Sequence, residues 1–364
     1  MEELRCIGCG SIIQSTDQKQ PGFVPSSKLE SSEDIVCRRC FRLKNYNEVT
    51  PLSITKDDYF KIIGKIGNSN ALIVKIIDIF DIEGSMIPQI QKLTNHNDLI
   101  IIANKVDLLP KSVKENKLKH HLTKIVADNN LKPIDIKLMS AKKNKNLDVI
   151  IQDILKQSQK RDIYVVGATN VGKSTFINQL LKNYTDVKEE VITVSSTAGT
   201  TLDFIKIPFG DFDVIDTPGL INDEQITHYI SAKTLKAVTP KKEIKPKGYQ
   251  LDPGQTLFIG GLARIDIISG SKSSMIVYVS EFLNIHRTKL ENADNLYETN
   301  LHKVLSPPYE GEEYPLKKHN FFIKNDQKYD IVLPGLGFIT VKGNVKISVH
   351  TLIHSMPYVR EALI

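Results

Sequence analysis

The chain has 364 residues, 41% of them hydrophobic and 25% charged, which is the composition of a soluble globular protein with material for two or three domains. No apolar run reaches the roughly 18 residues of a membrane span, and the acidic start Met1–Arg5 lacks the apolar core of a signal peptide, so we expect a cytoplasmic protein without a membrane partner. The formal net charge of +6 is mild, and it permits a nucleic-acid partner without requiring one.

Two Cys-x-x-Cys pairs open the chain, one formed by Cys6 and Cys9 and the other by Cys37 and Cys40. Without an export signal, structural disulfides are not expected. Four thiolates in two tight pairs suit a tetrahedral structural Zn²⁺. A redox motif would explain one pair but not two, and free core cysteines are the other alternative. We predict a zinc-binding module over residues 1–50.

Basic and aromatic residues surround the second cysteine pair. They are Arg38, Arg39, Phe41, Arg42, Lys44 and Tyr46. Cations beside aromatic rings suit RNA contact. Neutralisation of the zinc thiolates explains the same cations equally well, so both interpretations stay open.

Buried strands and surface helices alternate in the next part of the chain. A helix is expected at Lys56–Ile66, and the apolar runs Ala71–Asp78, Leu99–Ala103 and Ile134–Leu138 are typical of buried parallel strands. Helices are expected at Lys111–Asn129 and Asn146–Gln157. The alternation predicts an α/β domain.

The second of these strands runs directly into an N-K-x-D pattern formed by Asn104, Lys105 and Asp107. A carboxylate at Asp107 can accept hydrogen bonds from both N1–H and the 2-amino group of guanine. Adenine offers neither donor, so it would leave the carboxylate unpaired. Asn104 and Lys105 would brace the loop and cover the base. The pattern predicts that the chain binds GTP and GDP.

The third strand leads into an S-A-K pattern, formed by Ser140, Ala141 and Lys142. In guanine-nucleotide sites, residues in this position lie behind the O6 atom of the base. The pattern is nonspecific by itself. It supports a guanine-nucleotide site here because it follows its own strand in the same chain as N-K-x-D.

A phosphate-binding loop of the form G-x-x-x-x-G-K-[ST] begins at Gly167, between the apolar strand 162–166 and a helix that continues to Lys182. Backbone N–H groups and the helix N-terminus would surround a phosphate. Lys173 would reach the β- and γ-phosphate oxygens, and Ser174 would place its hydroxyl on Mg²⁺. The expected phosphate-binding residues are Asn170, Val171, Gly172, Lys173, Ser174 and Thr175. A chance match on a glycine-containing turn is the alternative.

Two switch segments follow. In Ser195–Leu202, Thr201 is the expected contact to Mg²⁺ and the γ-phosphate, with Thr200 as the alternative. A hairpin then ends in a D-x-x-G pattern, where Asp216 would hold Mg²⁺ through water and the Gly219 N–H would sense the γ-phosphate. Lys173, Thr201, Asp216 and Gly219 are therefore the expected catalytic residues.

The order of the motifs is unusual. GTPases normally run from the phosphate loop through the two switches to N-K-x-D and S-A-K, whereas here the last two come first. This order predicts a circularly permuted GTPase domain, a mostly parallel sheet with flanking helices, over residues 51–225.

The permuted motifs, the cysteine pairs before them and the loop of Asp78, Asp81, Gly84 and Ser85 resemble the YqeH family of circularly permuted GTPases. The resemblance implies a factor for assembly of the small ribosomal subunit. It implies as partner that subunit or its precursor, through rRNA or ribosomal proteins, and no DNA.

Residues 226–364 read as a third, β-rich domain. A basic linker, Thr239–Gly248, precedes short apolar runs that indicate a compact antiparallel unit with a helix near Thr288–Val304. The resemblance implies RNA or protein recognition there. The candidate basic contacts are His286, Arg287, Lys317, Lys318, His319 and the lysines of 241–247, although a solvated surface explains each of them singly.

Leu220 occupies the position where Ras-like enzymes carry a glutamine that orients the attacking water. Leucine cannot do this, so slow intrinsic hydrolysis is expected. In GTPases of similar loop sequence, an asparagine at the position of Asn170 helps to bind K⁺ beside the phosphates, so K⁺ stimulation is expected here. The alternative role for Asn170 is to cap the turn.

Two other functions compete with a GTPase switch. A non-enzymatic RNA-binding scaffold could use GTP as a structural ligand, but such a scaffold need not keep both Mg²⁺ partners. A metabolic phosphotransferase is disfavoured by N-K-x-D and by the lack of a separate substrate motif.

Overall fold

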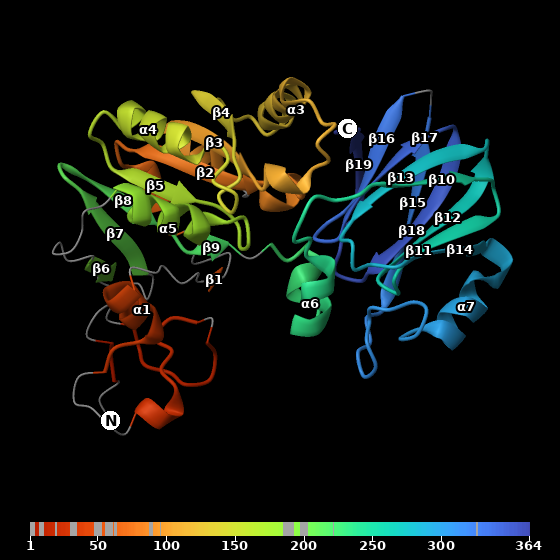
Figure 1. The fold of residues 1–364 in the computed structure, drawn as a ribbon, viewed down its shortest axis with the longest axis horizontal. Coiled ribbons are helices and arrows are strands. Elements are labelled where there is room, and N and C mark those ends of the chain that lie inside the picture. The colour runs from red at the N-terminus through yellow and green to blue at the C-terminus, as the bar shows by residue number, and fades with distance from the viewer. Residues whose placement is uncertain are drawn as a thin grey trace. The chain divides into compact units, whose positions relative to one another are not determined.

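The computed structural model describes residues 4–6, 11–18, 20–29, 35–46, 53–54, 61, 64–86, 90–94, 96–184, 193–196, 203–220, 222–324 and 327–364. The chain forms two compact units, one of residues 1–106 with 122–221 and one of residues 107–121 with 222–364 (Figure 1). No sequence pattern indicates that 107–121 groups with the C-terminal residues. The division into domains 1–50, 51–225 and 226–364 stays a prediction.

A seven-stranded sheet forms the centre of the first unit. Its order is β4-β3-β2-β5-β8-β7-β6, in which the first five strands are parallel, β7 pairs antiparallel with β8, and β6 pairs antiparallel with β7. The strands are β2 (Leu72–Asp78), β3 (Asp98–Asn104), β4 (Asp135–Leu138), β5 (Ile163–Val166), β6 (Thr193–Ser196), β7 (Asp203–Phe209) and β8 (Phe212–Asp216). The expected fold class is confirmed.

Helices cover this sheet. They are α3 (Glu115–Asp128), α4 (Leu147–Ser158) and α5 (Lys173–Tyr184), with short 3-10 helices at η2 (Glu83–Ser85), η3 (Ile90–Thr94) and η4 (Val106–Leu108). Apolar residues at helical spacing, such as Ile150 and Ile154 of α4 and Phe176 and Leu180 of α5, are buried in one core with β2, β3 and β5. Each such side chain contributes about 1.5–3 kcal/mol by leaving water.

The carboxyl ends of the parallel strands position the motifs. N-K-x-D follows β3, S-A-K follows β4, the phosphate loop follows β5, and D-x-x-G ends β8. Neighbouring parallel strands end at one edge of their sheet, where open α/β folds bind ligands. The permutation changes the order of the connections while the four loops still meet at this edge.

The described part of the N-terminal segment contains η1 (Ser26–Lys28) and α1 (Arg38–Tyr46). Its small core contains Val24 and Ile35 together with Cys6, Cys37 and Cys40. Further along, β1 (Ser53–Ile54) pairs in parallel with β9 (Gly219–Leu220). A two-stranded sheet thus joins a segment near the N-terminus to the D-x-x-G loop.

The second unit contains two five-stranded antiparallel sheets, in the orders β10-β13-β17-β16-β19 and β14-β11-β12-β18-β15. They share one apolar core, to which β11, β12, β13, β16, β17 and β18 contribute. The strands are β10 (Lys247–Leu251), β11 (Gln255–Ile259), β12 (Ala263–Gly270), β13 (Ser273–Val279), β14 (Ile285–Lys289), β15 (Leu316–Ile323), β16 (Lys328–Leu333), β17 (Gly337–Lys342), β18 (Val345–Leu352) and β19 (Tyr358–Glu361). The expected antiparallel β-rich region is confirmed.

The helical elements of this unit differ from the prediction of one helix near 288–304. The structure has η5 (Ile226–His228), α6 (Ala232–Val238), η6 (Leu290–Asn292) and α7 (Ala293–Asn300). Thr288 and Lys289 belong to β14 because they pair with Thr256 and Gln255 of β11. The helix is therefore shorter than predicted. None of the described helices is long and apolar enough to cross a membrane.

Candidate nucleotide and zinc sites

Asn104 connects three of the motif loops. Its Nδ2 donates to the Val171 carbonyl of the phosphate loop at 2.9 Å, and its Oδ1 accepts from the Ala141 N–H of S-A-K at 3.0 Å. The side chain is only 3% exposed, so these two bonds satisfy an amide that water barely reaches. The bracing expected of Asn104 thus extends to the phosphate loop as well as the base-reading loops.

Lys105 contacts a carboxylate that was not assigned a role from the sequence. Its Nζ lies 2.6 Å from Asp78 Oδ2 at the end of β2, and its backbone is left-handed, with φ of +68°. Asp78 in turn accepts from the Phe80 N–H at 2.9 Å. The ion pair fixes the lysine stem beside the loop. Asp107, two residues later in η4, is partly buried.

The S-A-K loop is held by its own backbone. Ser140 is fully buried, and its Oγ accepts from the Lys143 N–H at 3.1 Å. Ala141 is also fully buried, whereas Lys142 is exposed. Of the three S-A-K residues, only Lys142 is exposed to solvent.

The phosphate loop has the backbone geometry that its sequence demands. Gly172 has φ of +98°, and a Cβ there would lie 2.2 Å from Asn104 Nδ2, so only glycine fits. Asn170 is exposed and left-handed at φ of +62°, a conformation that asparagine tolerates better than most residues. Val171 is buried, Ser174 is partly buried and Thr175 is exposed.

Lys173 and Asp216 are both buried, and each acts electrostatically on the other. Lys173 is 8% exposed and Asp216 is 4% exposed. Burial lowers the pKa of Lys173, Asp216 opposes this effect, and the Arg39 guanidinium adds to it. Burial raises the pKa of Asp216, while Lys173 and Arg39 act in the opposite direction. A phosphate beside Lys173 and a cation beside Asp216 would favour the charged form of each.

The residues present fit Mg²⁺. Asp216 Oδ1 is buried and has no hydrogen-bond partner among the described residues, although a buried carboxylate oxygen normally has one. Asp216 through water, and the Ser174 hydroxyl, would hold the ion, which supplies positive charge beside the β- and γ-phosphate oxygens when bound. Thr201 and Thr200, expected to contribute as well, lie outside the described residues.

The D-x-x-G loop is attached to the phosphate loop. The Thr169 N–H donates to the Leu220 carbonyl at 2.8 Å, and a Cβ on Gly219 would lie 3.1 Å from Lys173 Nζ. Leu220 is 2% exposed. Its side chain is therefore packed and carries no polar group that could orient a water molecule.

Two buried cations near the phosphate loop were not expected from the sequence. Lys75 of β2 is fully buried, its Nζ donates to the Ser85 carbonyl at 3.3 Å, and burial, helped by Lys173, lowers its pKa to about 7. The only sequence signal was a lysine within an apolar run.

Arg39 is the other buried cation. It is 6% exposed, which argues against the RNA contact considered for this residue. The neighbouring Arg38 is partly buried and donates to Gln18 Oε1 at 2.7 Å. Arg39 acts electrostatically on Lys173 and Asp216, so a residue of the N-terminal module contributes to the charge of the phosphate site.

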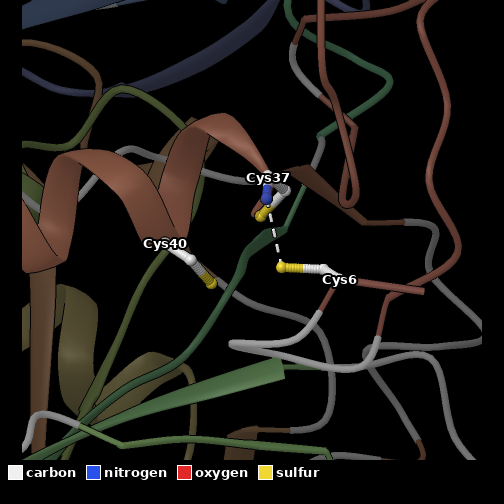
Figure 2. Close-up of side chains that lie close together, drawn as sticks. All are labelled: Cys6, Cys37 and Cys40. Atoms are coloured by element: carbon white, nitrogen blue, oxygen red, sulfur yellow. Dashed lines mark hydrogen bonds between the residues drawn. The ribbon is translucent and has the colours of Figure 1, made fainter. Parts of the chain in front are cut away.

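Three cysteines converge in the N-terminal module, as Figure 2 shows. The sulfur atoms of Cys6, Cys37 and Cys40 lie within 4.8 Å of one another, and all three residues are buried. The Cys37 N–H donates to Cys6 Sγ at 3.1 Å. The cluster is compatible with Zn²⁺. The expected fourth ligand, Cys9, lies outside the described residues.

Known proteins resemble the chain over nearly its whole length. The family described as "YqeH-like, C-terminal" matches residues 272–363, and the family described as "50S ribosome-binding GTPase" matches residues 162–246. The Bacillus subtilis protein described as "Uncharacterized protein YqeH" is 47% identical over 94% of this chain and 93% of its own. The Arabidopsis thaliana "NO-associated protein 1, chloroplastic/mitochondrial" is 29% identical over 93% of this chain and 69% of its own.

Among solved structures, GNP-bound YlqF from T. maritima covers 49% of this chain and 70% of that chain, with 15% sequence identity and a TM-score of 0.32. A score this low adds nothing to the fold assignment.

The fold and the motif loops together define a circularly permuted P-loop GTPase, which hydrolyses GTP to GDP and phosphate. The identity to the Bacillus subtilis relative over almost the full length of both chains shows the family. The chain belongs to the YqeH family.

Proposed function

We propose that this GTPase is a nucleotide-dependent switch in assembly of the small ribosomal subunit. It acts in the cytoplasm, binds rRNA or a ribosomal protein of the subunit or its precursor, and carries Mg²⁺ with the nucleotide and Zn²⁺ in the N-terminal module. Asn104, Lys105 and Asp107 read guanine, assisted by Ser140, Ala141 and Lys142. Residues 170–175 hold the phosphates, and Lys173, Thr201, Asp216 and Gly219 respond to the γ-phosphate.

The main support for a switch is that the D-x-x-G loop is attached on two sides. Leu220 bridges Ala168 of the phosphate loop, and both Gly219 and Leu220 pair with β1. Loss of a γ-phosphate contact at the Gly219 N–H would shift backbone shared by these pairings. Because of the permutation, the chain continues from this loop into residues 222–238 rather than into another strand of the central sheet.

Slow hydrolysis without a partner suits such a switch. Leu220 cannot orient water, so the rate depends on charge supplied beside the phosphates. Asn170 is placed on the exposed side of the phosphate loop, and we propose it as a contact for K⁺. A partner that orders the switch segments supplies the remaining stimulation.

The choice of subunit rests on the family resemblance of the cysteine pairs and the Asp78–Ser85 loop. The description of the family that matches residues 162–246 names the 50S subunit, so the experiment must include both subunits. The chain is sedimented with purified small or large subunits in the presence of a non-hydrolysable GTP analogue or GDP. Association with small subunits that depends on the nucleotide supports the proposal. Association with large subunits alone, or the same association in both nucleotides, contradicts it.

A further inference from the structure

Three connections between the two sheets leave from strand ends at one end of the β-rich unit. They link β12 to β13, β15 to β16 and β17 to β18, and strand pairing brings the ends of these strands together. Val345 pairs with both Gly270 and Ile323, and Lys328 pairs with Lys342. The turns and strand ends carry a set of exposed lysines, which we call the lysine tip: Lys272, Lys324, Lys328, Lys342 and Lys346.

The positive charge of the lysine tip is not neutralised by the described parts of the chain. None of its five members forms an ion pair with a described residue. Asp252 and Glu361 also lie at this end, but on the outer strands, after β10 and in β19. Lys328 and Lys342 stand directly opposite each other, an arrangement that destabilises a sheet. A binding role would explain why the chain keeps two opposed lysines that lower the stability of the sheet.

An exposed aromatic ring adjoins Lys324 and Lys346 of the lysine tip. Phe322 of β15 is 57% exposed and pairs across the strands with Lys346, while Lys324 Nζ lies 5.3 Å from its ring centroid. Val345, Ile347 and Ile323 point into the core, so Phe322 and Lys346 share the outer face. On the same face, Asn320 accepts a hydrogen bond from Ser348 at 2.7 Å. The ring is available for stacking.

We propose that the lysine tip and Phe322 form a binding surface for single-stranded RNA. Lysines from separate turns suit consecutive phosphates, and a bare ring among cations suits an unpaired base. An acidic peptide would use the lysines but would not require the ring. The inference rests on the proposed function in that the partner is a ribosomal particle, and it adds the class of ligand and its place.

This surface is separate from some of the basic candidates expected from the sequence. His286 and Arg287 lie on β14, the opposite outer strand of the same sheet from β15. Lys318 lies on the same face as Phe322, nearer the other end of β15, and pairs with His350. Lys318 can therefore extend the surface, whereas His286 and Arg287 cannot.

The test measures binding of a fluorescent single-stranded RNA of about 20 nucleotides to the full chain by anisotropy, over a range of salt concentrations. The triple variant K324Q/K342Q/K346Q should bind at least about tenfold more weakly, and the slope of log affinity against log salt should fall by about 2. Phe322→Ala should weaken binding by roughly fivefold to a hundredfold. The control K114Q/K117Q/K132Q removes the same charge from exposed lysines elsewhere and should bind like the parent.

Two outcomes would overturn the inference. Equal loss in the triple variant and its control would show a nonspecific charge effect. Binding of a poly-glutamate peptide by the tip with no RNA binding would identify a protein partner instead. GTP turnover and melting temperature are recorded for every variant and should equal those of the parent, so a failure of the RNA surface is distinguishable from a failure of the GTPase proposal.

Discussion

At the scale of single residues, Asn104 makes the motif loops interdependent. Its amide bonds to both the phosphate loop and S-A-K, so base and phosphate recognition share one buried side chain. Gly172 has no room for a Cβ because the same amide lies against it. A change at either position should therefore disturb both halves of the nucleotide site.

If Asp107 recognises guanine as proposed, the substitution Asp107→Asn should change which nucleotide the chain prefers. In Asp107→Asn, the amide can accept only one of the two guanine hydrogen bonds, whereas it can donate to the 2-oxo group of xanthine. We expect GDP affinity to fall by about a hundredfold or more and XDP affinity to rise. Titration with both nucleotides measures this. A variant that keeps its GDP affinity and still rejects XDP would remove Asp107 from base recognition.

Asn170 carries the expected K⁺ effect. Hydrolysis should be faster in KCl than in NaCl, and Asn170→Ala should lose this difference while binding nucleotide normally, because we propose the Asn170 side-chain oxygen as one ligand of the ion. Single-turnover rates in the two salts provide the measurement. Equal rates for the parent in both salts would exclude the K⁺ proposal.

Because of the buried Lys75, we expect the stability difference between the parent and the variant Lys75→Met to depend on pH. The pKa of Lys75 is lowered from 10.5 to about 7 in the folded chain. Below pH 7 the buried amine is therefore charged, and this charge lowers the free energy of unfolding by its full amount. Between pH 7 and 10.5 the unfolded chain binds more protons, and stability rises with pH. Lys75→Met removes the charge, so the variant should be more stable at pH 6.

This advantage of Lys75→Met should shrink by on the order of 2 kcal/mol between pH 7 and 9. Urea unfolding of both proteins at several pH values measures the free energy of unfolding, and all other titrating groups are common to the pair. An advantage that is constant with pH would mean that the buried amine keeps an ordinary pKa.

The sequence predicted the motif residues because each has a fixed spacing and a chemical reason. It did not predict the role of Asp78, Lys75 or Arg39. Their partners Lys105, Ser85 and Asp216 are set by how distant segments pack, and no spacing along the chain encodes that.

At the scale of elements, β2, β3, β4 and β5 lie within one residue of their predicted positions. Their apolar runs are unambiguous because both faces are buried, as in β2 and β3. In the β-rich unit, the strands that the sequence did not predict, β10, β14 and β19, are all outer strands whose residues are mostly exposed or half-buried. An exposed outer strand leaves no alternation to read, so its pairing becomes visible only in the structure.

From the cysteine cluster we expect that folding of the N-terminal module depends on a metal ion. We expect one zinc per chain, and Cys37→Ser should lose it and unfold the small core that Cys37 shares with Val24 and Ile35, because ion binding supplies much of the folding free energy of such modules. Metal analysis and limited proteolysis measure both effects, and Ser27→Ala serves as a control in the same module.

Cys9→Ser should lose zinc to the same extent, since Cys9 is the expected fourth ligand. Full zinc content in both cysteine variants would contradict a four-thiolate site. Nucleotide binding by the remaining unit is the check that each variant chain is otherwise folded.

At the scale of the whole molecule, the segment after N-K-x-D groups with the C-terminal residues. The Ile244 N–H donates to the Leu108 carbonyl at 2.9 Å, and the Lys111 N–H donates to Glu243 at 2.9 Å. The basic linker expected at 239–248 is thus bound by residues that directly follow Asp107. Neither periodicity nor charge in the sequence indicates this association, because it joins segments more than a hundred residues apart.

We propose that the nucleotide switch on this chain responds to the small ribosomal subunit. The most direct measurement is GTP turnover in KCl with and without purified small subunits, with large subunits and Lys173→Ala as controls. We predict slow turnover by the chain alone, strong stimulation by small subunits, and no stimulated turnover in the Lys173 variant. Turnover that is equally slow with either subunit, or stimulated only by large subunits, would contradict it.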